Sequence, residues 1–213
     1  MSPPYLITFL SFSLLICVLF TQTLALEKTR KEDSCTVSKT GVDEPGCTNC
    51  ATIQGCLSSP PNAFKKWYAI DLEANQFFSG KGFCNLTNRI ENSHFAGTSL
   101  VISGHNATIS CESKSFFIDW VVNSETRSYA TFLADLRLVN CFNPTADGGC
   151  IRLSVNTNDP PTTQLVGWIE SVTVAESTSA YSGGALAAIG SPLALNMNDC
   201  VFDRCQAQNG GAI

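Results

Sequence analysis

The sequence predicts an all-β fold in which short parallel strands wind into a solenoid, and three observations lead to it. A Gly-Gly phrase recurs along the chain, in "ADGGCIRLSV", "AYSGGALAAI" and "QAQNGGAI". Alternating apolar residues, which indicate strands, precede each phrase. The repeating unit is about 27 residues long and too small to bury its own apolar face. Stacking each unit on the next solves this problem, and an irregular β-sandwich is the alternative fold.

Residues 1–25 are predicted to be a cleaved secretory signal. The run from Tyr5 to Phe20 carries no charge, and Thr23 and Ala25 precede a plausible cleavage site. A single membrane anchor is the alternative, although this run is short against the ~20 residues that a span needs. The sequence therefore predicts a secreted or cell-surface protein, with no membrane span in its mature part.

Residues 26–66 are expected to form a cysteine-rich N-terminal cap. Within "CTNCATIQGCLSS", Ile53, Cys56 and Leu57 fall on one face of a short amphipathic helix. The Pro-Pro pair at 60–61 then ends that helix. An apolar helix face at this point would cover the first coil of the solenoid.

Residues 67–213 are expected to form the parallel β-helix itself. Strands are predicted at 67–72, 99–104, 107–111 and 116–122, and their spacing suggests roughly six coils. A polar Pro-Pro loop, residues 156–164, is expected to hang outside the repeat. The aliphatic residues predicted to face the core in the clearest repeats are Leu138, Val172, Val174, Leu195 and Val201.

The glycine pairs are expected to stand at tight corners. There the backbone turns through conformations that a Cβ would block, and the next coil passes close by. These corner residues are Gly148, Gly149, Gly183, Gly184, Gly210 and Gly211. Because Ile213 falls one residue into a new strand, the C-terminal coil is expected to be open and the β-helix to continue in a longer chain. A short protein whose open edge a partner covers is the alternative, and the fragment is expected to self-associate there.

These repeats resemble a known family. Residues 202–207, "FDRCQA", and 210–213, "GGAI", are similar to the repeats of polymorphic outer-membrane proteins, within the pectin-lyase-like superfamily. The segment "CTNCATIQGC" is similar to the opening of many secreted β-helix proteins, where it forms a capping helix. The resemblance implies a right-handed parallel β-helix with a short N-terminal capping helix.

The cysteines indicate disulfides. Cys17 belongs to the signal, and an even count in a secreted chain predicts pairing of the others without fixing the connectivity. These residues are Cys35, Cys47, Cys50, Cys56, Cys84, Cys111, Cys141, Cys150, Cys200 and Cys205. Cys141 and Cys200 are interpreted as members of one column of the stack. No second C-x2-C or His pair accompanies Cys47 and Cys50, so disulfides are favoured over zinc, and no metal or cofactor is predicted.

Two sequons, at Asn85 ("NLT") and Asn106 ("NAT"), predict N-glycosylation on solvent-facing loops. Two ordinary loop asparagines are the alternative interpretation. The net charge is −5, and the only basic cluster, "EKTRKED", is neutralised by its acidic neighbours. Nucleic acid is therefore not expected as a partner.

No convincing catalytic site is visible in the sequence. Enzymes that the resemblance suggests, such as pectate lyases and polygalacturonases, need several Asp residues from neighbouring coils on one face. Asp199, Asp203 and Arg204 form the best cluster, but they belong to one coil. The sequence thus predicts a structural or adhesive scaffold that binds an extracellular glycan or a protein partner and has no catalytic residues. A polysaccharide lyase or glycoside hydrolase is the alternative.

Overall fold

The computed structural model describes residues 34–58, 67–87, 99–122, 129–155, 165–190 and 193–213. The predicted signal, the Pro-Pro pair at 60–61 and the loop at 156–164 lie outside these residues. The fold is that of the compact unit Cys35–Ile213. Its elements are β1 (Ser34–Val37), β2 (Asn49–Cys50), α2 (Ile53–Ser58), β3 (Trp67–Leu72), β4 (Phe77–Ser79), β5 (Leu86–Thr87), β6 (Ser99–Ser110), β7 (Ile118–Val122), β8 (Tyr129–Val139), β9 (Phe142–Asn143), β10 (Ile151–Val155), β11 (Leu165–Ala175), β12 (Thr178–Ser182), β13 (Leu186–Ile189), β14 (Leu193–Asn198), β15 (Val201–Asp203) and β16 (Gln206–Asn209).

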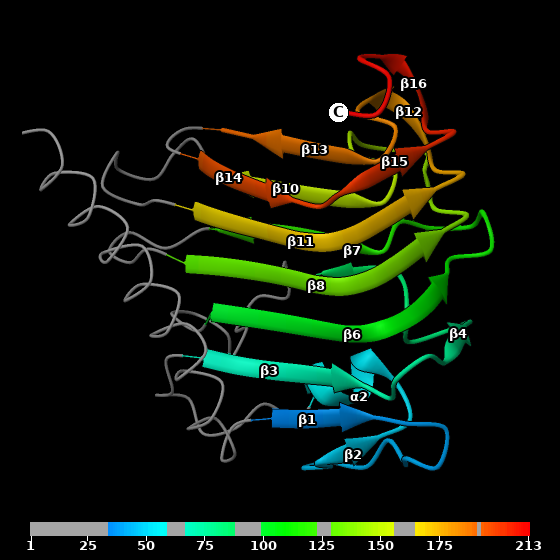
Figure 1. Ribbon diagram of the computed structural model, residues 1–213, viewed down its shortest axis with the longest axis vertical. Coiled ribbons are helices and arrows are strands. Elements are labelled where there is room, and N and C mark those ends of the chain that lie inside the picture. Colours follow the sequence, from blue (N-terminus) through cyan, green and yellow to red (C-terminus); the bar gives the residue numbers. More distant parts are fainter. Residues whose placement is uncertain (1–33, 59–66, 88–98, 123–128, 156–164, 191–192) are drawn as a thin grey trace, which may run out of the picture. The chain divides into compact units, whose positions relative to one another are not determined.

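The strands form a parallel β-solenoid, as predicted. Strands pair in parallel from coil to coil and form three sheets. The first is nine-stranded, with the order β14-β11-β8-β6-β3-β1-β2, β15 pairing with β11 and β4 with β6. The other two have the orders β13-β10-β7-β5 and β16-β12-β9. Figure 1 shows β3, β6, β8 and β11 lying one above another in the first of these sheets. The solenoid has about four turns, fewer than the six predicted. The segments predicted at 99–104 and 107–111 belong to one bent strand, β6.

Bends in the long strands are made by residues in the left-handed conformation. Asp135 in β8 and Ser171 in β11 have φ of 51° and 53°. The registers Ala134–Glu170 and Leu136–Val172 place these two residues over each other. The same turn recurs at Asp199, with φ of 51°, between β14 and β15. A short polar side chain tolerates the left-handed conformation better than a branched one. Short polar residues at this position therefore allow each coil to bend at the same place.

Each left-handed residue also shifts the phase of the inward side chains. Along β11, Ile169 and Val172 both face the core although three positions separate them, because Ser171 takes up the turn between them. The second left-handed residue, Glu176, has the same effect. Val174 and Ser177 lie on either side of it, three positions apart, and both are buried. Strict alternation of apolar and polar residues therefore holds within each straight segment but fails across a bend.

This shift explains where the predicted core is right and where it is wrong. Leu138, Val172 and Val174 are buried, as predicted, and Leu195 is partly buried against the core. Val201 is 54% exposed, so its assignment to the core was wrong. The turn at Asp199 moves the inward position from Val201 to Cys200 and Phe202, which pack against the core instead.

The Gly-Gly pairs stack on one another from coil to coil. Gly149 N donates to Gly183 O at 2.9 Å, and Gly184 N donates to Gly211 O at 2.5 Å. The first glycine of each pair is left-handed, with φ of 75° at Gly148, 63° at Gly183 and 80° at Gly210. The second approaches its neighbour closely, since a Cβ at Gly184 would lie 2.5 Å from Gln206 N in the next coil. A Cβ at Gly148 or Gly183 would clash as well, with Ile151 O or Leu186 O, whereas Gly211 is itself left-handed and a Cβ there would meet nothing within 4 Å.

The predicted helix is present at the N-terminal end as α2. Its buried residues are Ile53 and Cys56, and the Asp43 carboxylate accepts hydrogen bonds from Ala51 N, Thr52 N and Thr52 Oγ1 at 2.7–3.0 Å before its first turn. The Tyr68 hydroxyl of β3 donates to Cys56 O at 2.9 Å and joins the helix to the first coil. In the described part of the chain, no helix is long and apolar enough to span a bilayer.

Candidate functional site

Four disulfides join eight of the ten cysteines that the structure describes. The pairs are Cys35–Cys56, Cys47–Cys50, Cys84–Cys111 and Cys141–Cys150. The first two brace the cap, whereas Cys84–Cys111 ties the first coil to the second. Cys200 and Cys205 are free thiols in this structure, so the expectation of pairing is not met for these two. Burial is the main cause that raises the pKa of the Cys205 thiol, and the proximity of Asp203 adds to it.

The interpretation that Cys141 and Cys200 share one column is wrong. The registers of β12 with β9 and with β16 place Cys141, Ser177 and Cys205 at equivalent positions. Cys200 lies instead one residue before Val201, which pairs with Thr173, and so corresponds to Val172. Each of these coils has two left-handed turns, and the column of a cysteine depends on which turn it follows. Cys200 follows the first turn of its coil, whereas Cys141 follows the second turn of its own.

The cap brings several sulfur atoms together. Those of Cys35, Cys50 and Cys56 lie within 4.8 Å of one another, and Cys35 Sγ is 3.2 Å from Cys50 Sγ. All three belong to disulfides, so in this state they offer no thiolate to a metal ion. The two disulfides pack side by side as a structural core for the cap.

Both sequon asparagines are exposed. Asn85 stands directly before β5 and Asn106 lies at the bend of β6, and both have left-handed φ values, 62° and 63°. Asn85 is one of the residues that line a cavity between the cap and the first two coils, whereas Asn106 lies on the bend beside His105. Each side chain is therefore accessible, and their surroundings differ.

The structure brings together a set of carboxylates that the sequence did not reveal. Asp71, Asp135, Glu170 and Asp199, here called the acidic row, come from four different coils. Asp71 and Glu170 are joined by the chain of registers Asp71–Ser103, Ser103–Ala134 and Ala134–Glu170. Asp135 and Asp199 occupy the turn one position further on, with Ser171 between them.

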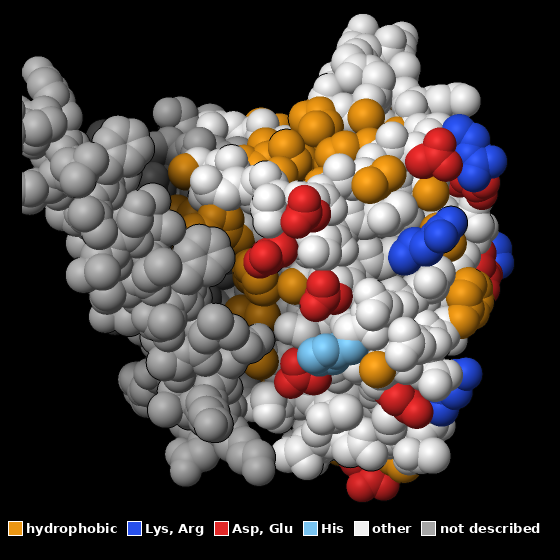
Figure 2. Space-filling view, viewed as in Figure 1, with side chains coloured by type: hydrophobic (Ala, Val, Ile, Leu, Met, Phe, Trp, Pro, Cys, Tyr) orange, Lys and Arg blue, Asp and Glu red, His pale blue; other side chains and the backbone are white. Residues whose placement is uncertain are grey.

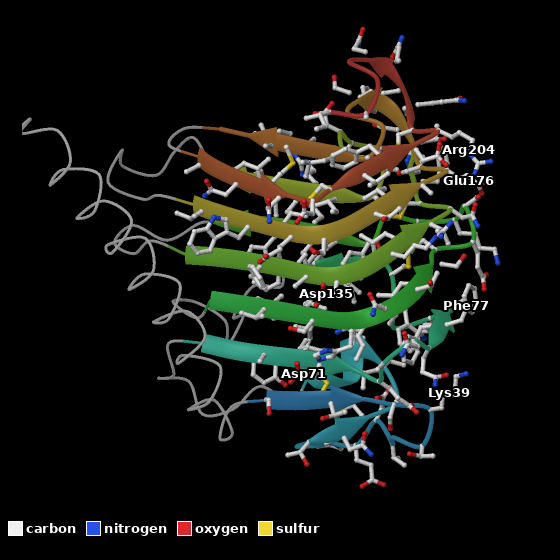
Figure 3. The ribbon with its side chains drawn as sticks, in the orientation of Figure 1. Lys39, Asp71, Phe77, Asp135, Glu176 and Arg204 are labelled. Carbon is white, nitrogen blue, oxygen red and sulfur yellow. A yellow bond between two sulfur atoms is a disulfide. The ribbon has the colours of Figure 1, made fainter. Side chains whose placement is uncertain are left out.

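The acidic row lies on the outer face of the nine-stranded sheet. Asp135, Glu170 and Asp199 are exposed, and Asp71 is partly exposed, with its Oδ1 3.5 Å from His105 Nε2. Figure 2 shows acidic side chains following one another up this face beside the histidine, and Figure 3 labels Asp71 and Asp135 among them. Neighbouring coils are about 4.8 Å apart, so the backbones of Asp135 and Asp199, two coils apart, are separated by about 10 Å.

An exposed aromatic side chain stands beside the acidic row. Trp168 is 45% exposed and lies two positions before Glu170 on β11, so both side chains point to the same face of the sheet. Trp168 pairs in register with Phe132 and Asn196 of the neighbouring strands. The face thus offers one flat apolar surface next to several hydrogen-bond acceptors.

The cluster singled out from the sequence does not stay together. Asp199 joins the acidic row at the first bend, whereas Asp203 and Arg204 lie at the second. Arg204 contacts Glu176 Oε1 at 2.7 Å through Nη2 and Asp203 Oδ2 at 3.2 Å through Nε. Figure 3 shows Glu176 and Arg204 together at this second bend, away from Asp71. Arg204 is thus an exposed ion-pair partner of a repeat corner.

The acidic row left a signal in the sequence that strict alternation hides. Asp135 and Ser171 each precede a buried apolar residue and follow another by two positions, and Asp199 stands at the equivalent place between Met197 and Cys200. Aligning "LADLRL", "WIESVTV" and "MNDCVF" on that step would have placed the three side by side. Comparison of the chain with protein-family models, curated proteins and solved structures finds no match.

Proposed function

We propose that this chain is a secreted or cell-surface β-helix protein that acts as a structural or adhesive scaffold and binds an extracellular glycan or protein partner. The binding surface is the outer face of the nine-stranded sheet. The observation that carries the proposal is the acidic row beside Trp168, built from four coils whose register fixes their spacing. A rigid sheet presents such groups at a constant repeat, which suits a ligand that is itself extended.

The chemistry of this face favours a glycan without acidic groups. The face of a sugar ring is apolar enough to stack on an indole, and the carboxylates of Glu170 and Asp199 accept hydrogen bonds from hydroxyls. A row of negative charges repels polyanions such as galacturonan. A basic protein surface is the other partner that this charge would attract, and its binding would weaken steeply with salt.

The extracellular location and the finer family assignment rest on separate support. Four disulfides are compatible with an oxidising compartment. The stacked Gly-Gly corners and the capping helix α2 support the resemblance to right-handed β-helix proteins of the pectin-lyase-like superfamily with "GGAI" repeats. Self-association through the edge of the last coil, β14 to β16, also stays a prediction.

One observation favours an enzyme as the second candidate. Stacking of the coils puts the backbones of Asp135 and Asp199 about 10 Å apart, and inverting glycosidases hold their two carboxyl groups ~6.5–9.5 Å apart. Glu170 lies near both. If these residues act together, the protein is a glycoside hydrolase in which one carboxylic acid protonates the leaving oxygen and the other activates water.

Binding of the secreted protein to a panel of neutral and acidic oligosaccharides tests the first candidate. Trp168→Ala and Glu170→Gln are each expected to weaken binding of a neutral glycan at least ~10-fold, which corresponds to about 1.4 kcal/mol. Tyr181→Ala is the matched control, because Tyr181 is equally exposed but lies on β12 of another sheet. Affinity that is unchanged in Trp168→Ala would remove this face from the proposal.

Release of reducing sugar from the same panel separates the two candidates. The scaffold proposal expects none. Sugar release by the wild type that is lost in both Asp135→Asn and Asp199→Asn, but kept in Asp203→Asn, would replace the scaffold with a hydrolase.

A further inference from the structure

A cavity of about 910 Å³, lined mostly by polar residues, lies where the cap meets the first two coils. Gln54 and Ser58 of α2 line it from the cap, Lys81 and Asn85 from the first coil, and Glu112 and Lys114 from the second. Gly80 and Gly82 contribute backbone only. Its volume exceeds that of one sugar ring.

The lining offers hydrogen-bonding groups from every side. Gln54 Nε2 donates to Ser58 Oγ at 3.3 Å, and Lys114 Nζ contacts Glu112 Oε2 at 2.7 Å. This hydrogen bond and the charge of Lys114 lower the pKa of Glu112. Among the described residues that line the cavity none is aromatic. Polar contacts without a stacking surface give a free sugar little affinity, because each hydroxyl exchanges water for protein at small net gain.

Asn85 lies in this lining and belongs to the sequon "NLT". Its backbone N–H donates to Phe116 O at 2.8 Å, and the preceding Cys84 is bonded to Cys111 of the next coil. The following Leu86 is fully buried. The backbone on both sides of Asn85 is thus fixed, while its side chain is exposed.

We propose that Asn85 carries an N-linked glycan whose first sugars are held in this cavity. A tethered sugar meets the lining at an effective concentration in the millimolar range, so contacts too weak to retain a free sugar suffice. In the attachment step Asn85 Nδ2 forms a bond to the anomeric carbon of a lipid-pyrophosphate-linked oligosaccharide. The lipid pyrophosphate leaves, the amide loses one proton, and nothing is oxidised or reduced.

The second sequon provides an internal comparison. Asn106 is equally exposed and has nearly the same φ as Asn85, but it stands at the bend of β6 and does not line the cavity. A glycan there extends into solvent. The inference rests on the proposed extracellular location, which both sequons share.

The test is the full chain secreted from a eukaryotic culture, analysed by site-resolved glycopeptide mass spectrometry before and after native treatment with an amidase that releases N-glycans. The glycan at Asn85 is expected to be released ~10-fold more slowly than that at Asn106, and at the same rate after denaturation. The double variant Lys81→Ala/Glu112→Ala should remove the difference. Lys39→Ala, a lysine outside the cavity lining, should leave it unchanged. Thr87→Ala should abolish the Asn85 glycan alone, and Thr87→Ser should keep it.

Each result bears on a different statement. A glycan at Asn106 with none at Asn85 overturns this inference and leaves the extracellular location intact. Equal native release rates at the two sites overturn the seating in the cavity. A secreted protein without glycan at either site overturns the inference as well, and a protein retained inside the cell contradicts the proposed location.

Discussion

The two ends of the described solenoid are built from the same repeat but are closed differently. At the N-terminal end, α2 and the disulfide Cys35–Cys56 cover the first coil, with Ile53, Cys35 and Cys56 fully buried and Leu57 partly buried against them. At the other end, the coil of β14, β15 and β16 has a neighbouring coil on one side only among the described residues. Ile169 is 2% exposed, whereas Met197, its equivalent one coil on, is 42% exposed.

The difference shows that the core of each coil is largely supplied by its neighbours. Val174 is fully buried, but Phe202, which pairs with it in register, is only partly buried despite its larger side chain. The amount of apolar surface removed from water sets the contribution of a side chain to stability. The same substitution should therefore cost much more in the interior coils than in the last one.

The largest effect is expected when a charge at an inward position of an interior coil is compared with a charge at an outward position of the last coil. Val174→Asp buries a carboxylate among aliphatic side chains and is expected to cost more than ~4 kcal/mol, enough to prevent folding. Val201→Asp, at an exposed position of β15, and Glu176→Ala, at a corner, should each cost less than ~1 kcal/mol. Secretion yield and thermal unfolding measure the difference. Similar losses in Val174→Asp and Val201→Asp would show that the strand phase is wrong.

Much of the fold follows from local sequence signals. The strand at 67–72 and the capping helix were located correctly, because an apolar alternation and an i, i+3, i+4 pattern are each complete within a few residues. Val201 was misplaced because the left-handed turn at Asp199 interrupts that alternation. A turn that inserts a single residue has no strong composition of its own, since Asp, Ser and Asn occur in many contexts.

The candidate site was harder to predict than the fold. The acidic row is assembled by register between coils, and the separations along the chain differ from one coil to the next. Asp135 and Ser171 are in register across the 156–164 insertion, so no constant period connects Asp71, Asp135 and Asp199. The two free thiols were not foreseen for a similar reason, because pairing depends on which column each cysteine joins.

Disulfide removal sharpens the comparison of the two ends. The double variant Cys35→Ala/Cys56→Ala opens a buried crosslink of the cap and is expected to cost about 2–5 kcal/mol. Cys200→Ala at the open end removes a partly buried free thiol and should cost less than ~1 kcal/mol. Chemical denaturation provides the free energies of unfolding. Alkylation of the unreduced protein under denaturing conditions should label two cysteines in the mature chain, and six or more labelled would contradict the disulfides.

High pH is expected to destabilise the capped N-terminal end of the solenoid first. Burial raises the pKa of Tyr68 to about 12 from its ordinary value of 10.0. A raised folded pKa means that the stabilising contribution is complete below pH 10 and is lost as the pH rises toward 12. The loss amounts to about 2–3 kcal/mol at the upper limit. Tyr68→Phe should therefore flatten the decline in stability between pH 10 and 12, at a cost near neutrality of about 1 kcal/mol for the hydrogen bond to Cys56 O. An identical decline in both proteins would contradict this origin.

The smallest expected effect distinguishes a corner glycine that lacks room for a Cβ, Gly184, from one that has room but is left-handed, Gly211. In Gly184→Ala the new Cβ would meet the backbone of Gln206 and push β16 away from β12, which should cost about 1–3 kcal/mol. In Gly211→Ala the Cβ meets nothing within 4 Å, and only the left-handed φ of 61° remains unfavourable, at about 1 kcal/mol. Hydrogen exchange resolves the two, because Gln206 N donates to Ser177 O at 2.9 Å across these coils. Faster exchange of the Gln206 amide in Gly184→Ala, with Gly211→Ala unchanged there, is the expected result. Equal exchange in the two variants would mean that the last coil is already too loosely packed for a clash at Gly184 to matter.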